Sequence, residues 1–276
     1  MKKNKTKHLF TLLEVLVSMG VFSLLMLALM QFFSAAQGVW EKSGSKTELF
    51  DSARIAAQIL TEDLTIAFYG DEYHEMGETS NKYIFYKNTG NTRLTFATQR
   101  GGGKGLTEVD YNWNTANLTF EIRELSESDN SAPIGSSGWV TYPSKDWIEA
   151  IQGKPATPIA ENVLNVHFRD MRIPGDACRP PRMVIATFAL LSSAGYEKLD
   201  TLIRPTIASG SEDSKTEAVK NQIRTYFNAM TPPETPVAAK DKFIDNAVPE
   251  SGSDVPAKQI IFDNVQFFKL IIPIER

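Results

Sequence analysis

The chain is 276 residues long, enough for one or two domains with a buried core, and its 42% hydrophobic and 22% charged residues are ordinary for a folded protein. The net charge of −4 gives no indication of nucleic-acid binding, and the single cysteine, Cys178, excludes an intrachain disulfide. Four basic residues lie close to the N-terminus: Lys2, Lys3, Lys5 and Lys7. Without them 25 basic residues face 33 acidic ones, so the rest of the chain has a net charge of −8.

An apolar segment follows these lysines, from Phe10 to about Phe33, and no charged residue occurs between Glu14 and Glu41. Because about 20 apolar residues span a bilayer as a helix, we expect a single transmembrane helix over residues 10–36. The preceding lysines favour a short cytoplasmic N-terminus in the inner membrane, with the C-terminal part in the periplasm or an extracellular filament. A cleaved secretory signal is the alternative, with Ser34-Ala35-Ala36 as its small-residue site, although the apolar run is long for such a signal.

Glu14 is unusual because it lies four residues into this apolar segment. A carboxylate inside a bilayer costs about 2.5–3.5 kcal/mol on insertion scales, so such a residue normally has a partner or a function. Its position near the start of the helix also allows the side chain to extend to the lipid headgroups. Spacing alone leaves both interpretations open.

The segment Phe10–Val17, with the sequence FTLLEVLV, closely resembles the N-terminal processing motif of type IV pilins and type II secretion pseudopilins. The resemblance implies cleavage by a prepilin peptidase between Leu9 and Phe10, methylation of the new N-terminus, and Glu14 as the fifth mature residue. It also implies that Glu14 pairs with the Phe10 amine of a neighbouring subunit, which would set the register of a filament. The family nearly always has glycine before the cut, whereas this chain has Leu9, and an uncleaved chain would remain a membrane anchor that keeps its lysines.

Helix-compatible sequence continues to about Phe68, because no proline occurs before residue 133. Apolar residues then recur at spacings of three and four, which predicts an amphipathic helix over residues 37–69 that buries one face. The expected buried stripe is Leu49, Ala53, Ala56, Ala57, Leu60, Leu64 and Phe68. The opposite face carries Glu48, Asp51, Arg54, Gln58 and Glu62.

Residues 70–276 are expected to form a β-rich extracytoplasmic domain, which makes the fold class α+β with a long N-terminal helix on a mostly antiparallel sheet. Alternation places Leu118, Phe120 and Ile122 on one strand face. Residues 126–160 are rich in loop-forming residues, and an irregular insert is expected at about 205–258, interrupted by a short helix at 216–229 with Val219, Ile223 and Phe227 on one stripe. The predicted strands are 83–87, 93–97, 108–113, 118–124, 163–169, 182–190 and 265–274.

This part of the chain is similar, more loosely, to minor pseudopilins of the J type and to the Verru_Chthon pilin-like cassette proteins. The resemblance rests on Phe50–Leu64, on strand-like segments such as Leu94–Phe96 and Pro181–Val184, and on the ending Phe267–Arg276. It implies a minor subunit, at a filament tip, rather than the abundant shaft subunit.

No group of residues predicts catalysis. Gly101–Gly105 surrounds Lys104 without the spacing or the Ser/Thr of a phosphate-binding loop, and His74 and His167 have no second histidine or cysteine at ligand spacing. The acidic pairs Glu212-Asp213 and Asp241/Asp245 do not match a calcium-binding loop. We therefore expect no catalytic, cofactor or metal residues, and no enzyme activity.

The sequence favours a structural subunit whose partners are other pilin-like subunits, a prepilin peptidase, an inner-membrane assembly platform and membrane lipid, without nucleic acid. A second hypothesis is a membrane-anchored binding protein that does not assemble, which Leu9 supports.

Overall fold

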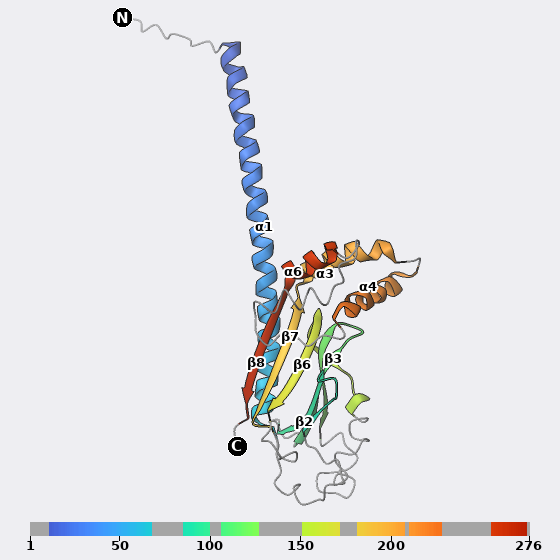
Figure 1. The fold of residues 1–276 in the computed structure, drawn as a ribbon. Helices are drawn as coiled ribbons and strands as arrows, with labels where there is room; N and C mark the ends of the chain where they lie inside the picture. Colours follow the sequence, from blue (N-terminus) through green and yellow to red (C-terminus); the bar gives the residue numbers. More distant parts are fainter. Residues whose placement is uncertain are drawn as a thin grey trace, which may run out of the picture. The chain divides into compact units, whose positions relative to one another are not determined.

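The computed structural model describes residues 11–67, 85–99, 106–126, 151–171, 181–207, 210–227 and 255–274 (Figure 1). The chain divides into two compact units, residues 1–47 and 48–276. A long N-terminal helix and antiparallel sheets confirm the predicted α+β class.

Helix α1 extends from Leu12 to Thr65 without interruption and therefore belongs to both units. In the second unit its buried residues are Leu49, Ala53, Ala56, Leu60, Asp63 and Leu64. This confirms most of the predicted stripe, although Ala57 is only half-buried and Phe68 lies outside the described residues. The five polar residues predicted on the opposite face, from Glu48 to Glu62, are all exposed.

The first sheet is an antiparallel meander of five strands in the order β1-β2-β3-β4-β5. The turn between β3 and β4 follows Asn114 and contains Asn117, and the aromatic, β-branched runs on either side of such residues predict antiparallel pairing. The strands are β1 Phe85–Lys87, β2 Arg93–Gln99, β3 Leu106–Asn114, β4 Thr119–Ser126 and β5 Thr157–Ala160. Strand β5 was not predicted: it lies at the end of the loop-rich segment 126–160 and forms by pairing with β4, which is distant in the sequence.

The second sheet has three antiparallel strands in the order β6-β7-β8. They are β6 Val163–Met171, β7 Met183–Leu191 and β8 Val265–Pro273. The register shifts between Val163 and Asn165, so Val163 and Val166 both enter the main core although their odd spacing would place them on opposite faces. All seven predicted strands are present, with ends shifted by up to two residues.

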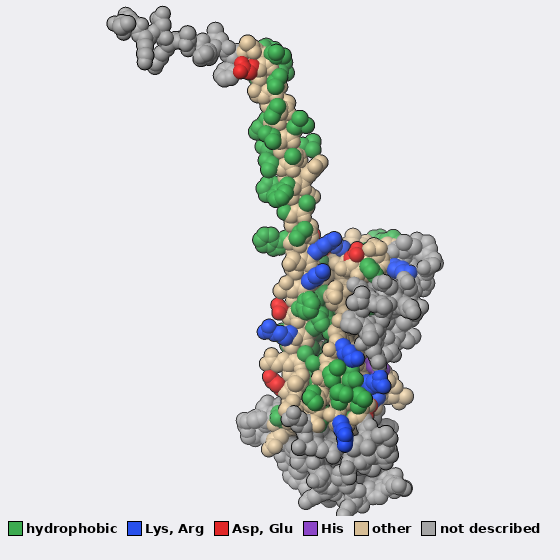
Figure 2. Space-filling model, turned by 60° about the vertical axis from the view of Figure 1, so that its left-hand side comes forward, with side chains coloured by type: hydrophobic (Ala, Val, Ile, Leu, Met, Phe, Trp, Pro, Cys, Tyr) green, Lys and Arg blue, Asp and Glu red, His purple; other side chains and the backbone are tan. Residues whose placement is uncertain are grey.

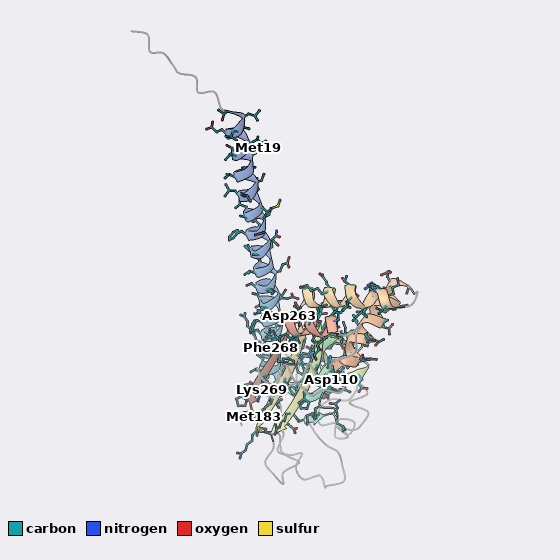
Figure 3. All side chains as sticks on the ribbon, turned by 45° about the horizontal axis from the view of Figure 1, so that its top comes forward. Met19, Asp110, Met183, Asp263, Phe268 and Lys269 are labelled. Carbon is teal, nitrogen blue, oxygen red and sulfur yellow. The ribbon has the colours of Figure 1, made fainter. Side chains whose placement is uncertain are left out.

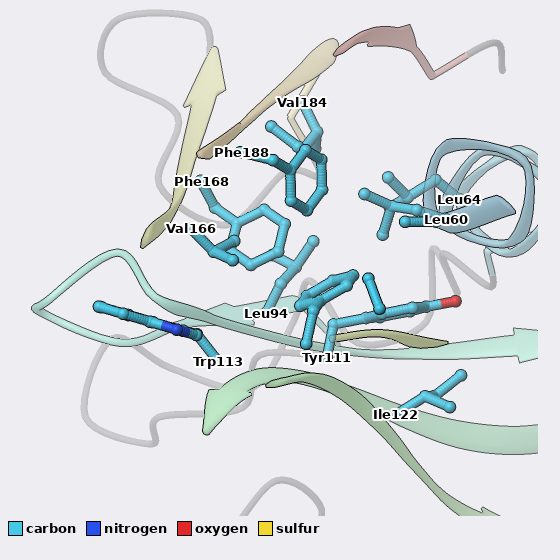
Figure 4. Close-up of a cluster of buried hydrophobic side chains, with 14 of the residues drawn as sticks. Leu60, Leu64, Leu94, Tyr111, Trp113, Ile122, Val166, Phe168, Val184 and Phe188 are labelled. Carbon is cyan, nitrogen blue, oxygen red and sulfur yellow. The ribbon is translucent and has the colours of Figure 1, made fainter. Parts of the chain in front are cut away.

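The main hydrophobic core lies between α1 and the inner faces of the two sheets (Figure 4). Leu60 and Leu64 project from the helix towards Val184 and Phe188 of β7. A row of aromatic rings crosses the first sheet at centroid distances of 5.8–6.0 Å and ends on Phe188 at 5.2 Å: Phe85, Phe96, Tyr111 and Phe120. This packing joins α1 to both sheets in one core.

Three helices form a second core at one end of the outer face of β6-β7-β8 (Figure 1). They are α3 Ser193–Ile203, which continues into the 3-10 turn η3 Arg204–Thr206, α4 Glu212–Phe227 and α6 Val255–Asn264. Val219 and Ile223 of α4 are fully buried there, as predicted. The insert expected to be irregular at about 205–258 therefore contains α4 and the start of α6, because the apolar end of the second sheet provides a surface that these helices cover.

Leu118 corrects the predicted alternation of β4. It precedes the strand, has a positive φ of 56°, and packs in the second core, whereas Phe120 and Ile122 pack in the main core. The Asn114 side chain accepts hydrogen bonds from the backbone N–H groups of Ala116 and Asn117, which forms a tight turn just before Leu118. The turn changes the direction of Leu118, and buried contacts retain this unusual backbone conformation.

Candidate functional site

The candidate site is the first turn of α1, where Thr11 caps the helix. The Glu14 N–H donates a hydrogen bond to Thr11 Oγ1 at 3.3 Å and another to the Thr11 carbonyl at 3.0 Å. Thr11 is therefore the N-cap, and Glu14 occupies the third helical position, the Ser/Thr-x-x-Glu spacing of a capping box. This local geometry explains why the helix begins at Leu12.

The Glu14 side chain is exposed and forms no hydrogen bond or ion pair with any residue in the described part of the chain. Apolar residues surround it on the same side of the helix: Leu13, Val17, Val21, Phe22 and Leu25. The polar side chains on the same side, Thr11 and Ser18, bond the Glu14 backbone and not its carboxylate, so within the described residues no hydrogen bond would compensate for desolvation of the carboxylate in an apolar environment.

Hydrophobic side chains cover α1 from Leu12 to Trp40, and all of them are exposed (Figure 2). Their most apolar 18-residue window has a mean hydropathy of 2.3 and no buried residue. The uncharged segment Val15–Trp40 is about 39 Å long at about 1.5 Å per residue, more than the roughly 30 Å hydrocarbon core of a bilayer. By length and composition, α1 is thus able to cross a membrane, and a signal sequence near the N-terminus would have the same properties.

Two of the three serine hydroxyl groups in this segment, those of Ser18 and Ser23, are satisfied within the helix. Ser18 Oγ donates to the Glu14 carbonyl at 2.6 Å, and Ser23 Oγ donates to the Met19 carbonyl at 2.8 Å (Figure 3 labels Met19). Such bonds to the preceding turn allow serine to lie in an apolar environment. Glu14 is the one charged residue in the described segment before Glu41, and it has no comparable internal partner there.

The size of two free energies helps to choose between a Glu14 that has a partner and a Glu14 that only extends to the lipid headgroups. A negative charge in the first turn of an exposed helix gains about 0.3–1 kcal/mol from the helix dipole. This is less than the roughly 2.5–3.5 kcal/mol that a carboxylate costs inside a membrane. The helix terminus therefore offsets only part of the cost, so a charged Glu14 inside a membrane also needs a headgroup location or a nearby cation.

Several residues named from sequence do not join this site. Leu9 and Phe10, the predicted processing residues, lie outside the described residues, as do His74, Gly101–Gly105, Cys178 and Asp241/Asp245. His167 lies half-buried on β6, and Glu212 pairs with Arg204 at 2.8 Å and Lys215 at 3.3 Å on α4. Within the described ranges, no three His, Cys, Asp or Glu side chains are grouped in a way that could hold a metal ion.

The structure adds buried charges that sequence reasoning missed. Asp110 on β3 is fully buried; it accepts hydrogen bonds from Arg93 Nε at 2.5 Å and Thr95 Oγ1 at 2.8 Å, with Arg123 Nη1 at 3.4 Å. The alternation of EVDYNW places Asp110 on the face opposite Tyr111, which was an available signal for a polar face. The cations lie on neighbouring strands, so only strand pairing brings them to Asp110, and the group stabilises the sheet.

A second missed contact involves Asp63, which lies on the buried side of α1 and is 4% exposed. The Tyr111 hydroxyl donates a hydrogen bond to Asp63 Oδ2 at 2.5 Å. The contact ties the helix to the first sheet, so it has a structural role.

Comparison of the chain with protein-family models, with curated proteins and with solved structures found no match.

Proposed function

We propose that this chain is a pilin-like structural subunit, minor in abundance, that is anchored in the inner membrane by α1 and assembles with similar subunits through that helix. The observation that carries the proposal is Glu14, a lone carboxylate in the first turn of an exposed apolar helix. The cost of its charge in an apolar environment is relieved when a neighbouring subunit provides a cation at the right height.

The proposed cation is the amine of Phe10 on an adjacent subunit, which a prepilin peptidase would create by cutting after Leu9. The amine of one subunit would reach Glu14 of the next only when the two helices are shifted by one particular distance along their axes. This requirement would give the assembly a defined register. The other partners in this proposal are membrane lipid and the platform that supports assembly. Catalysis has no role in it.

A second candidate is a membrane-anchored binding protein that does not assemble. Leu9 favours it, because a large residue before the cut disfavours the processing that would create the amine. The β-rich unit, residues 48–276, would then contact its ligand while Glu14 lies among lipid headgroups.

The assembly proposal is tested with Glu14→Gln, which keeps the size and hydrogen-bonding ability of the side chain and removes its charge. The matched control is Glu41→Gln, a second exposed acid of α1 beyond the uncharged segment. We expect Glu14→Gln to reduce the yield of subunit recovered in filament or high-mass membrane fractions at least tenfold at equal expression, because at least about 1.4 kcal/mol of pairing energy is lost. Assembly at the wild-type level by Glu14→Gln would refute the pairing role.

Processing is tested by measuring the mass of the intact protein extracted from native membranes. Loss of the first nine residues with one added methyl group supports the pilin-like proposal. If the native chain has its full-length mass and the Leu9→Gly variant has the processed mass, the result supports the second candidate for the native chain. A product that begins after Ala36 identifies an ordinary secretory signal and contradicts both.

A further inference from the structure

The uncharged segment of α1 ends with a tryptophan. Trp40, the last residue before Glu41, is 81% exposed, and the preceding Val39 is 70% exposed. The indole N–H of Trp40 forms no hydrogen bond within the part of the chain that the structure describes. Because a tryptophan combines a large apolar ring with one polar N–H, it is most stable where lipid tails meet lipid headgroups.

Two lysines follow on one side of the helix, Lys42 and Lys46, four residues apart. Both are exposed, and neither forms an ion pair with any residue in the described ranges. No acidic residue lies three or four positions from either lysine, which are the spacings at which a helix brings side chains together. Glu41 precedes Lys42 directly, but it is turned from it by about 100° around the helix axis. The two ammonium groups thus lie on the same side of the helix, where like charges at this spacing repel.

A phosphate group fits these residues. Each ammonium group has three N–H donors, and one phosphate between the two lysines accepts hydrogen bonds from both and removes their repulsion. A phospholipid is the source of phosphate that also explains Trp40, because its tails adjoin the apolar segment and its headgroup adjoins the charged one. A free phosphate ion gives an exposed tryptophan no apolar neighbour.

The length of the uncharged segment agrees with this location. Val15–Trp40 is about 39 Å long, more than the roughly 30 Å hydrocarbon core and less than the roughly 40–45 Å that includes both headgroup layers. An upright helix therefore has Glu14 in one headgroup layer and Trp40 in the other. Lys42 and Lys46 follow Trp40 by about 3 Å and about 9 Å along the axis. Side chains on a helix tilt towards its N-terminus, so both lysines extend back towards the membrane.

We propose that Trp40, Lys42 and Lys46 bind the phosphate groups of anionic phospholipids at the membrane surface, and we call these three residues the headgroup collar. Anionic lipids are preferred because the collar, with Glu41 included, has a net charge of +1, whereas the phosphate of a zwitterionic lipid is already neutralised by its own cation. The inference rests on the proposed anchoring by α1 and defines how deeply the helix is inserted. Held at this end, the helix keeps Glu14 in the opposite headgroup layer, where its charge is hydrated, until assembly brings it against other helices.

The test uses the full chain with Cys178→Ser and Ser43→Cys, with a fluorophore attached at exposed position 43, in phosphatidylcholine vesicles. A small fraction of either phosphatidylglycerol or phosphatidylcholine carries a nitroxide just below its headgroup and quenches the fluorophore on close approach. We expect quenching by nitroxide phosphatidylglycerol to be at least about threefold stronger, because each lysine near the surface favours anionic lipid severalfold. Lys42→Gln combined with Lys46→Gln should bring this ratio to about one, as should high salt.

The matched control is Arg54→Gln combined with Arg182→Gln, which removes two exposed positive charges from residues 48–276 and should leave the ratio unchanged. Trp40→Ala should lower quenching by both nitroxide lipids about twofold, because the helix is no longer held at this depth. A ratio that survives the loss of both lysines would contradict the inference, as would an equal fall in the control variant.

A separate fluorophore at Val21→Cys, quenched by lipid with a nitroxide deep in its acyl chain, reports whether α1 lies in the bilayer. If position 21 is quenched and the ratio at position 43 is about one in the chain with all its lysines, the collar is wrong and the proposed anchoring stands. If position 21 is not quenched, the helix is outside the bilayer and both proposals are overturned. Unchanged quenching at position 21 in the lysine variants shows that they remain inserted, so a lost ratio at position 43 then supports the collar.

Discussion

The hydrogen bond between Tyr111 and Asp63 should contribute substantially to the stability of the β-rich unit, and Tyr111→Phe removes it together with the longer bond from the hydroxyl to the Ile59 carbonyl at 3.4 Å. Tyr111 is fully buried, and its ring stacks between Phe96 at 5.9 Å and Phe120 at 5.8 Å, contacts that phenylalanine retains. The substitution leaves the Asp63 carboxylate, 4% exposed, without this donor at 2.5 Å.

Hydrogen bonds to charged groups contribute about 1.5–3 kcal/mol to stability. Taking about 2 kcal/mol, we expect the unfolding equilibrium constant of Tyr111→Phe to rise about 30-fold. The free energy of unfolding is measured by urea titration of the full chain in mild detergent, followed by near-ultraviolet circular dichroism, which reports the aromatic core.

Tyr196→Phe is the matched control, because the buried Tyr196 hydroxyl has no hydrogen-bond partner among the residues that the structure describes. Burial, with a further effect of Asp200, raises the pKa of Tyr196 above its usual 10.0, so the phenol is protonated at neutral pH. Removing an unsatisfied hydroxyl should change the free energy of unfolding by less than about 0.5 kcal/mol or increase it. Equal effects of the two substitutions would show that the bond to Asp63 adds no net stability.

Two further substitutions test the packing of the same unit by urea titration. Asp110→Asn leaves the buried Arg93 without its carboxylate partner and should cost about 3 kcal/mol. Glu212→Gln at an exposed pair should cost less than about 1 kcal/mol, and similar values for the two substitutions would refute the importance of the buried network. Gly195→Ala places a Cβ 2.5 Å from Asn264 Cβ and should cost about 1–3 kcal/mol. The control is Gly90→Ala, whose new Cβ has its nearest contact at 3.6 Å and should be nearly neutral. If Gly195→Ala is also tolerated, α3 and α6 separate easily.

Much of the fold was predictable because its signals are local. Apolar spacing along the chain predicted the buried side of α1 from Leu49 to Leu64, and alternation predicted the strands of the meander. The candidate site was predictable for the same reason: a carboxylate four residues into an apolar run needs no tertiary structure to be noticed. The same few residues make Thr11 a suitable N-cap of the helix. The hydrogen bond from the Glu14 N–H to Thr11 Oγ1 becomes visible only in the structure, where the helix begins at Leu12.

Other features depend on residues that are distant in sequence. Strand β8 reaches β7 only after more than 70 intervening residues, and the helices α3, α4 and α6 are positioned by the apolar end of the sheet that they cover.

The sequence by itself determined that the chain has a long apolar N-terminal helix with one acid in its first turn, followed by a β-rich part, because these properties depend on neighbouring residues. Only the tertiary structure decided which charges are buried together and that Leu118 leaves the face of Phe120. Those outcomes depend on strand register and on a bulge at Val163–Asn165, where a shift of one residue exchanges the two faces of a strand.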